Sequence, residues 1–357
     1  MKVLQLMSYT TLTVSNAFLR GKGSIPVNKI PFKYYFSSKG DHSTLSMKEI
    51  DLTVVKSISD EHNDGGWVVP INIPHKKALP NHYDTSAKNY DYFNAKNSLP
   101  MNNLVATFLK SYSPNCKSVL DVTCGTGAQV FDLVQRGYDV TGSDINVKML
   151  EVARDKALKI APDFHNRFHV GDMCSVRLGK FDAVISMFNA VGHITKKDFE
   201  YAMVNIRFNL NKDGVYIFDI YNADYLRYGN NIMKLTIDWV ESKPGGAIAR
   251  YVQHSDIDNN NVLRSYSTSY EDSADGQRTV LTTAQTLQVY TAEELVKMLD
   301  RCGFNVLEQC GVDKAKFSNT ETERIFTVAQ VKPDCHDLPL GGDSSIVISG
   351  DIIDTSN

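Results

Sequence analysis

The sequence predicts an α/β fold in which a doubly wound sheet of seven strands carries an antiparallel β insertion between its fifth strand and its last helix. Two observations support this prediction. Short apolar runs alternate with helical patterns from about residue 117 to residue 220, which is typical of a parallel sheet with helices on both faces. Between about residues 233 and 289 apolar and polar residues alternate, which is typical of antiparallel strands with one exposed face.

The core elements are expected in a regular order. Strands are predicted at 117–122, 138–144, 167–172, 181–187 and 214–220, with helices over about 128–136 and 196–210. In the insertion, turn residues at 244–246, 258–261 and 275–276 separate about four strands. Thr291 is a good N-cap with Glu294 three residues later as a capping box, so a helix is expected from there to Gly303. Strands at 305–310 and 324–331 close the fold.

These elements divide the chain into four parts. Residues 1–80 are expected to form an N-terminal extension with short β elements. Residues 81–232 and 290–331 form the α/β core, and residues 233–289 form the insertion. The tail, residues 332–357, has five Asp and no Lys or Arg beyond Lys332. We expect this acidic tail to be a flexible, solvated end.

The turn after the first predicted strand is the most informative segment of the core. It reads Asp121-Val122-Thr123-Cys124-Gly125-Thr126-Gly127. Its two glycines let the backbone approach a ligand closely, and the start of the next helix leaves amides free to meet that ligand. Asp144 ends the second strand, where an acid is placed to accept hydrogen bonds from ribose hydroxyls. The sequence therefore predicts a nucleoside-containing cofactor.

The residues around this turn also indicate which cofactor is bound. A dinucleotide fingerprint requires Gly or Ala where this chain has Val130, so a pyrophosphate is disfavoured. Asp172 closes the third strand, where its carboxylate is placed to accept from the exocyclic amine of adenine. The backbone amide of Met173 is placed to donate to the adenine ring. Three acids after three successive strands describe a site for adenosine with a short, charged tail that is not a phosphate.

S-adenosylmethionine fits this description, and from about residue 83 to residue 331 the chain resembles the class I methyltransferases, which have a Rossmann-like sheet. The resemblance rests on residues 120–127, Asp144, the step Gly171-Asp172-Met173 and strand 181–187, with Thr123 in place of the family's first glycine. For Cys124 a packing role is the alternative. The resemblance implies a cofactor site made of Asp121, Thr123, Cys124, Gly125, Thr126, Gly127, Asp144, Ile145, Met149, Asp172, Met173 and Met187.

The insertion, a lead-in helix with Tyr83 and Tyr90, and the segment 187–194 resemble the small-molecule N-methyltransferases. The similarity is to nucleotide-linked amino-sugar N,N-dimethyltransferases and, more distantly, to glycine and sarcosine N-methyltransferases. It implies that the pair Gly192-His193 faces the methyl acceptor, and that Phe188, Asn189 and His193 bind it.

Methyl transfer chiefly requires alignment of the reactants, and orientation alone is worth roughly 7 to 11 kcal/mol. His193, with an ordinary pKa of about 6.5, suits either a proton acceptor or an orienting hydrogen bond. Tyr83 and Tyr90 are expected to cover the methionine tail of the cofactor and to bond the acceptor. The structural alternatives are capping or packing for His193 and core packing for the two tyrosines.

Composition narrows the choice of partners. A net charge of −3 gives no reason to expect nucleic acid, and no apolar run reaches the roughly 18 residues of a membrane span. The six cysteines show no metal spacing and no paired framework, so we expect reduced thiols and no metal site. The apolar face of the insertion must be covered, so we expect residues 233–289 to lie over the acceptor site, and this face also suggests a contact between two copies of the chain.

Several alternatives stay open on the sequence alone. O-methylation of a hydroxyl, α-N-methylation of a peptide, and a non-catalytic partner subunit that binds the cofactor compete with methylation of a small amine. The three intact acids favour catalysis. A cytoplasmic location is expected, but residues 1–40 contain six Lys or Arg and no Asp or Glu, which is typical of organelle-targeting segments.

Overall fold

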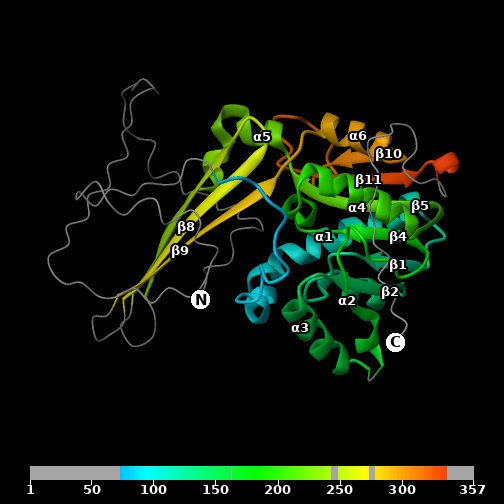
Figure 1. Cartoon of the computed structure of the whole chain (residues 1–357), viewed down its shortest axis with the longest axis horizontal. Coiled ribbons are helices and arrows are strands. Elements are labelled where there is room, and N and C mark those ends of the chain that lie inside the picture. The colour runs from blue at the N-terminus through cyan, green and yellow to red at the C-terminus, as the bar shows by residue number, and fades with distance from the viewer. Residues whose placement is uncertain (1–72, 162, 243–247, 273–277, 336–357) are drawn as a thin grey trace, which may run out of the picture. The chain divides into compact units, whose positions relative to one another are not determined.

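A computed structural model describes residues 73–161, 163–242, 248–272 and 278–335 of the chain (Figure 1). From His75 onward the described residues belong to one compact unit. The β elements expected before residue 73 and the tail beyond residue 335 lie outside the described residues. The predicted boundary at residue 80 stays a prediction, and the segment that begins at His75 packs on the core through backbone bonds such as Ala78 N to His193 O, 2.8 Å.

Seven strands form one sheet in the order β10-β11-β5-β4-β1-β2-β3, and the predicted fold class is confirmed. Strands β1 to β5 are parallel, and β10 and β11 form an antiparallel edge. The strands are β1 (Ser118–Asp121), β2 (Asp139–Asp144), β3 (Phe168–Val170), β4 (Phe181–Ser186), β5 (Leu210–Tyr221), β10 (Phe304–Cys310) and β11 (Arg324–Val331).

Within the described ranges, six α-helices connect or cover these strands (Figure 1). They are α1 (Tyr90–Tyr112), α2 (Ala128–Gln135), α3 (Val147–Leu158), α4 (Lys196–Phe208), α5 (Ala223–Arg227) and α6 (Ala292–Arg301). Short 3-10 turns include η3 (Ala87–Asn89), η4 (Phe164–Arg167), η5 (Ala190–His193), η6 (Tyr228–Leu235) and η7 (Pro333–Cys335). None of the helices in these ranges combines the length and apolar character needed to cross a bilayer.

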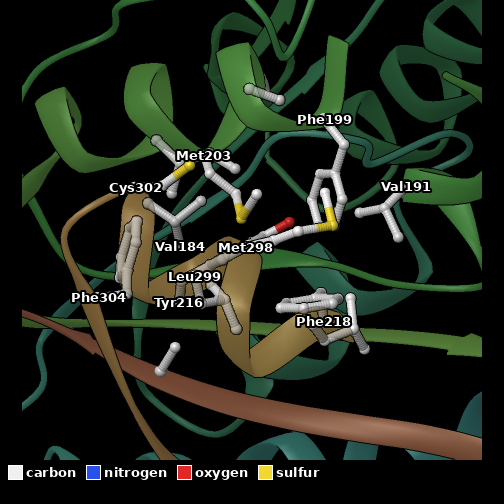
Figure 2. Packing of buried hydrophobic residues seen from close by; sticks show 14 of the residues in the cluster. Val184, Val191, Phe199, Met203, Tyr216, Phe218, Met298, Leu299, Cys302 and Phe304 are labelled. Atoms are coloured by element: carbon white, nitrogen blue, oxygen red, sulfur yellow. The ribbon is translucent and has the colours of Figure 1, made fainter. Parts of the chain in front are cut away.

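The side chains of β5 show how one strand supports two cores. Successive residues of a strand point to opposite faces, so Tyr216 and Phe218 pack with α4 and α6, whereas Val215 and Ile217 pack with the helices of the other face. Figure 2 shows Phe199 and Met298 reaching the first face from the two covering helices. Burying each such side chain stabilises the fold by about 1.5 to 3 kcal/mol.

The insertion forms the predicted four-stranded antiparallel sheet in the order β6-β7-β8-β9. Its strands are β6 (Ile237–Ser242), β7 (Ile248–Ile257), β8 (Val262–Asp272) and β9 (Arg278–Gln288). At its base Leu263, Leu287 and Val289 join a separate cluster with Tyr221 and Leu226. This cluster fixes the root of the insertion to the end of β5. The expected contact between two copies of the chain stays a prediction.

Two local predictions needed correction. Tyr83 and Tyr90 do not share a lead-in helix, because Tyr83 lies in a turn and Tyr90 is the first residue of α1. Thr291 is the N-cap of α6 and accepts from the amide of Glu294 at 3.1 Å. The Glu294 carboxylate, however, bonds to Lys196 and to Asn261, so only half of the predicted capping box forms.

Candidate active site

A cavity opens at the carboxyl ends of the parallel strands, the place where open α/β sheets bind their ligands. Most of the predicted site residues line it. These are Tyr83, Tyr90, Thr123, Gly125, Asp144, Ile145, Met149, Asp172, Met173, Met187, Phe188 and His193. Asp121, Cys124, Thr126, Gly127 and Asn189 are not among its lining residues. No residue of 233–289 lines the cavity where the insertion is described, so its place over an acceptor stays a prediction.

The glycine turn has the backbone geometry that the sequence pattern requires. Gly125 and Gly127 have φ values of +51° and +87°, which non-glycine residues rarely adopt. A Cβ atom on Gly127 would lie 2.7 Å from the ring of Phe131. The amide of Gly125 donates to Asp144 Oδ2 at 2.8 Å. This bond ties the turn after β1 to the end of β2 and shapes one wall of the cavity.

Asp121 lies beneath the turn, with 1% of its surface exposed. Its Oδ1 accepts from the amide of Thr123 at 3.1 Å, but its buried Oδ2 has no hydrogen-bond partner in the described part of the chain. Burial raises the pKa of Asp121 to about 8; the Thr123 amide opposes this rise, and the nearby Asp144 carboxylate adds to it. A positively charged ligand group beside Asp121 would stabilise its ionised form.

Asp144 is held by backbone amides, among them those of Gly125 and Asn146, the latter at 2.8 Å. Burial raises the pKa of Asp144, and the amides of Asn146, Gly125 and Ile145 oppose the rise. A carboxylate has about four acceptor positions, so Asp144 keeps capacity for a further donor, such as a hydroxyl. Asn146 also caps α3, because its Oδ1 accepts from the amide of Met149 at 2.8 Å.

A segment that precedes the first helix, His75 to Asp84, crosses this cavity. Lys77 pairs with Asp172, and the Nδ2 of Asn146 donates to the carbonyl of Pro80 at 2.7 Å. His75 Nδ1 lies 2.9 Å from Thr286 Oγ1 of β9. We call residues 75–84 the cover segment, because these contacts hold it across the cavity at the carboxyl ends of the parallel strands.

Tyr83 and His193 meet at the cavity wall, with the hydroxyl 2.8 Å from His193 Nε2. Burial lowers the pKa of His193 to about 3, and the nearby rings of His82 and His75 lower it further. Burial raises the pKa of the Tyr83 hydroxyl well above its ordinary value. Both side chains are therefore neutral at pH 7. The lowered pKa makes His193 a weak proton acceptor, so the pair suits the orienting role predicted for His193 better.

The predicted residues outside the cavity have other partners. A Cβ atom on Gly142 would lie 2.9 Å from Cys124 Sγ, and burial raises the pKa of the Cys124 thiol well above its ordinary value. These features match the packing alternative for Cys124. Thr126 Oγ1 donates to Asp91 Oδ1 at 2.5 Å, and the amide of Tyr221 donates to Asn189 Oδ1 at 3.0 Å.

Sequence reasoning missed four polar residues of the site. Asn146 has a local signal, an Asn directly before a helical pattern, which is typical of an N-cap. Lys77, His75 and His82 have none, because they lie in a stretch without helical or strand periodicity. Only their contacts with distant elements reveal them.

The fold and the cavity define a class of protein. Residues 119–214 match a family model described as a methyltransferase domain, and these residues run from β1 into β5. The sheet order and the antiparallel insertion match the class I methyltransferase fold. Residues 119–214 therefore match a methyltransferase domain, and the core of the chain has the class I methyltransferase fold.

Individual proteins resemble parts of the chain. This chain is 36% identical over 115 residues to the dTDP-3-amino-3,4,6-trideoxy-alpha-D-glucopyranose N,N-dimethyltransferase of Streptomyces venezuelae. The matched residues cover 32% of this chain and 46% of that protein. The chain is 39% identical over 71 residues to the magnesium-protoporphyrin O-methyltransferase of Rhodobacter capsulatus, covering 19% of this chain and 30% of that protein. The matches thus span less than half of either relative.

A solved structure extends the similarity beyond the matched sequence. An S-adenosylmethionine-dependent methyltransferase from Clostridium acetobutylicum superimposes with a TM-score of 0.56 at 18% identity, covering 70% of this chain and 99% of that chain. At this identity the likeness shows a shared fold.

Proposed function

We propose that this protein transfers a methyl group from S-adenosylmethionine to the amine of a small molecule, with amino sugars as the first class to test. The observation that carries the proposal is that one cavity combines Asp144 and Asp172 at strand ends with the Tyr83–His193 pair. The similarity to an amino-sugar N,N-dimethyltransferase supports the choice of acceptor.

The residues at the strand ends fit the proposed cofactor. Asp144 would accept from the ribose hydroxyls, and Asp172 with the amide of Met173 would bind adenine. The unpartnered Oδ2 of Asp121 would meet the ammonium of the methionine tail, and this positive charge would favour the ionised form of the acid. When bound, the cofactor supplies an electrophilic methyl group on its sulfonium.

The chain's own contribution to the reaction is orientation and exclusion of water. Tyr83 and His193 are neutral and share one hydrogen bond, which fixes the phenol oxygen as a potential acceptor for the N–H of an incoming amine. The cover segment crosses the cavity beside them and would limit access of water. A neutral nucleophile held in line needs little further assistance.

Methyl transfer from labelled S-adenosylmethionine to a panel of acceptors tests the proposal. The panel pairs a nucleotide-linked amino sugar with the same sugar bearing a hydroxyl in place of the amine, and adds glycine and sarcosine. We expect label on amines only. Label on the hydroxyl analogue would instead support O-methylation, which the similarity to the O-methyltransferase favours. Cofactor binding without transfer to any acceptor would support a non-catalytic subunit.

A further inference from the structure

The turn that follows β4 has an unusual backbone. Phe188 and Asn189 have φ values of +64° and +59°, so two successive non-glycine residues adopt the left-handed conformation. This conformation is disfavoured for residues with a Cβ atom, although Asn tolerates it better than Phe. Phe188 lines the cavity, and η5 with His193 begins directly after Asn189. Strained backbone at such a place persists only when its surroundings hold it.

The surroundings that hold this turn centre on Asp219 of β5. Its Oδ1 accepts from the amide of Phe188 at 2.6 Å, and its Oδ2 accepts from the amide of Asn189 at 3.2 Å. The same carboxylate pairs with Arg324 of β11, and the two side chains are 0% and 1% exposed. Asp219 thus connects the strained turn to two strands of the core.

The chemistry of these three partners selects a carboxylate at residue 219. Two backbone N–H groups and a guanidinium are all donors, and only an ionised acid offers two acceptor oxygens without a competing N–H or O–H. An asparagine of the same shape would turn an NH₂ group toward one of the donors. Arg324 is itself braced, with its guanidinium 4.7 Å from the ring centre of Tyr221.

We propose that Asp219 is a positioning residue for the methyl acceptor: it holds the Phe188–Asn189 turn in its left-handed conformation and so sets the place of Phe188 and His193 in the cavity. This inference rests on the proposed function, because it assigns these two residues to the acceptor. It makes Asp219 important for acceptor use while leaving the acids that would bind the cofactor in place.

Asp182 of β4 provides a matched control. Its carboxylate also accepts from two backbone amides, those of Lys117 and Ser118, at 2.9 and 3.0 Å. It is not among the residues that line the cavity. Asp182→Asn therefore removes the charge from another carboxylate that accepts from two backbone amides, at a place that the proposal does not use.

The test compares Asp219→Asn with Asp182→Asn in three measurements: amide hydrogen exchange at residues 188 and 189, the Kd for S-adenosylhomocysteine, and kcat/KM for the acceptor. We expect Asp219→Asn to raise exchange at this turn and to lower kcat/KM by about 10- to 100-fold, the loss typical of hydrogen bonds to a charged group. The Kd should change by less than about threefold, since a positioning residue for the acceptor acts on the transition state for transfer. Asp182→Asn should change none of the three.

Unchanged exchange at residues 188 and 189 would overturn the inference, as would a Kd that weakens in step with activity. If Asp219→Asn does not fold, Asp219→Glu replaces it. Glutamate keeps the charge beside Arg324, but its extra methylene displaces the carboxylate from the two amides, so the same selective loss is expected. Should the native protein methylate no acceptor, the proposed function fails, whereas hydrogen exchange still decides whether Asp219 holds the turn.

Discussion

Lys77, in the cover segment, pairs its ammonium with the carboxylate of Asp172 at the end of β3. Burial alone would raise the pKa of Asp172, but the bonds from Lys77 and from the amide of Cys174 outweigh it and lower that pKa. Asp172 is the acid that we propose for the adenine amine. A cofactor that uses this acid must therefore compete with Lys77 for it.

Replacing Lys77 with Met should tighten the binding of S-adenosylhomocysteine, because it removes this competitor. The two side chains are 33% and 26% exposed, so solvent screens the pair and the gain should be at most about 1 kcal/mol, or roughly fivefold in Kd. Isothermal titration calorimetry measures this change in Kd. Lys148→Met, which removes an exposed pair with Glu151, is the control and should change nothing. Weaker binding would mean that Lys77 belongs to the bound site.

Asp144→Ala should weaken S-adenosylmethionine binding by about 1.5 to 3 kcal/mol, the value of hydrogen bonds to a charged group. Asp139→Ala, at the other end of the same strand, is the control, because the Asp139 carboxylate pairs with Arg167 at the surface, away from the cavity. Calorimetric titration of the cofactor into each variant measures the two affinities. Equal affinity of the Asp144 variant and the native protein, or tighter native binding of NAD than of S-adenosylhomocysteine, would contradict the assignment of this cofactor.

His193→Asn should lower kcat/KM for the acceptor by about tenfold or less and leave cofactor affinity nearly constant. Because burial lowers the pKa of His193 to about 3, the ring is a weak proton acceptor at neutral pH. Tyr83→Phe removes the same hydrogen bond and also the phenol oxygen proposed to accept from the amine, so the double variant should lose about as much as Tyr83→Phe alone.

Steady-state kinetics across the pH range provides the measurement for His193. If kcat/KM falls on the acid side between pH 6 and 8, the same fall should persist in His193→Asn, because His193 becomes protonated only far below that range. A loss of 10²- to 10⁴-fold together with a shift in the pH of this fall would instead identify His193 as the general base. Loss of cofactor binding in step with activity would identify a structural role.

The lowered pKa of His193 also predicts loss of stability in acid. The unfolded side chain has a pKa of about 6.5, so below that pH the unfolded state binds a proton that the native state excludes. The stability that neutral His193 contributes is complete above about pH 6.5 and is lost as pH falls toward 3. The slope from this residue is at most about 1.4 kcal/mol per pH unit.

Urea unfolding at pH 7 and pH 5 measures this effect. His193→Gln should reduce the difference in unfolding free energy between the two pH values. His75, whose pKa is also lowered by burial, should account for part of the remaining slope. An unaltered slope in His193→Gln would show that His193 is already protonated in the native state near pH 6.

Features of the fold that neighbouring residues determine are the ones that the sequence predicts best. The bounds of β11 agree with the predicted 324–331, because a run of eight largely apolar residues needs no distant information. Thr291 was recognised as an N-cap for the same reason. The full capping box of Thr195 and Asp198 at the start of α4 was missed, although the pattern is local. The Glu294 half of the box at Thr291 fails because Lys196 and Asn261, distant in the chain, take its carboxylate.

By itself the sequence determined the sheet, the insertion and the strand-end acids Asp121, Asp144 and Asp172, because strand ends and glycine turns are encoded by neighbouring residues and parallel strands bring their carboxyl ends to one edge. Only the tertiary structure decided what these acids meet. Lys77 and Asp172 are 95 residues apart, and Asp219 and Arg324 are 105 apart. Such pairs depend on how separate elements pack, and no local pattern of polarity records which charged side chain is brought to which acid.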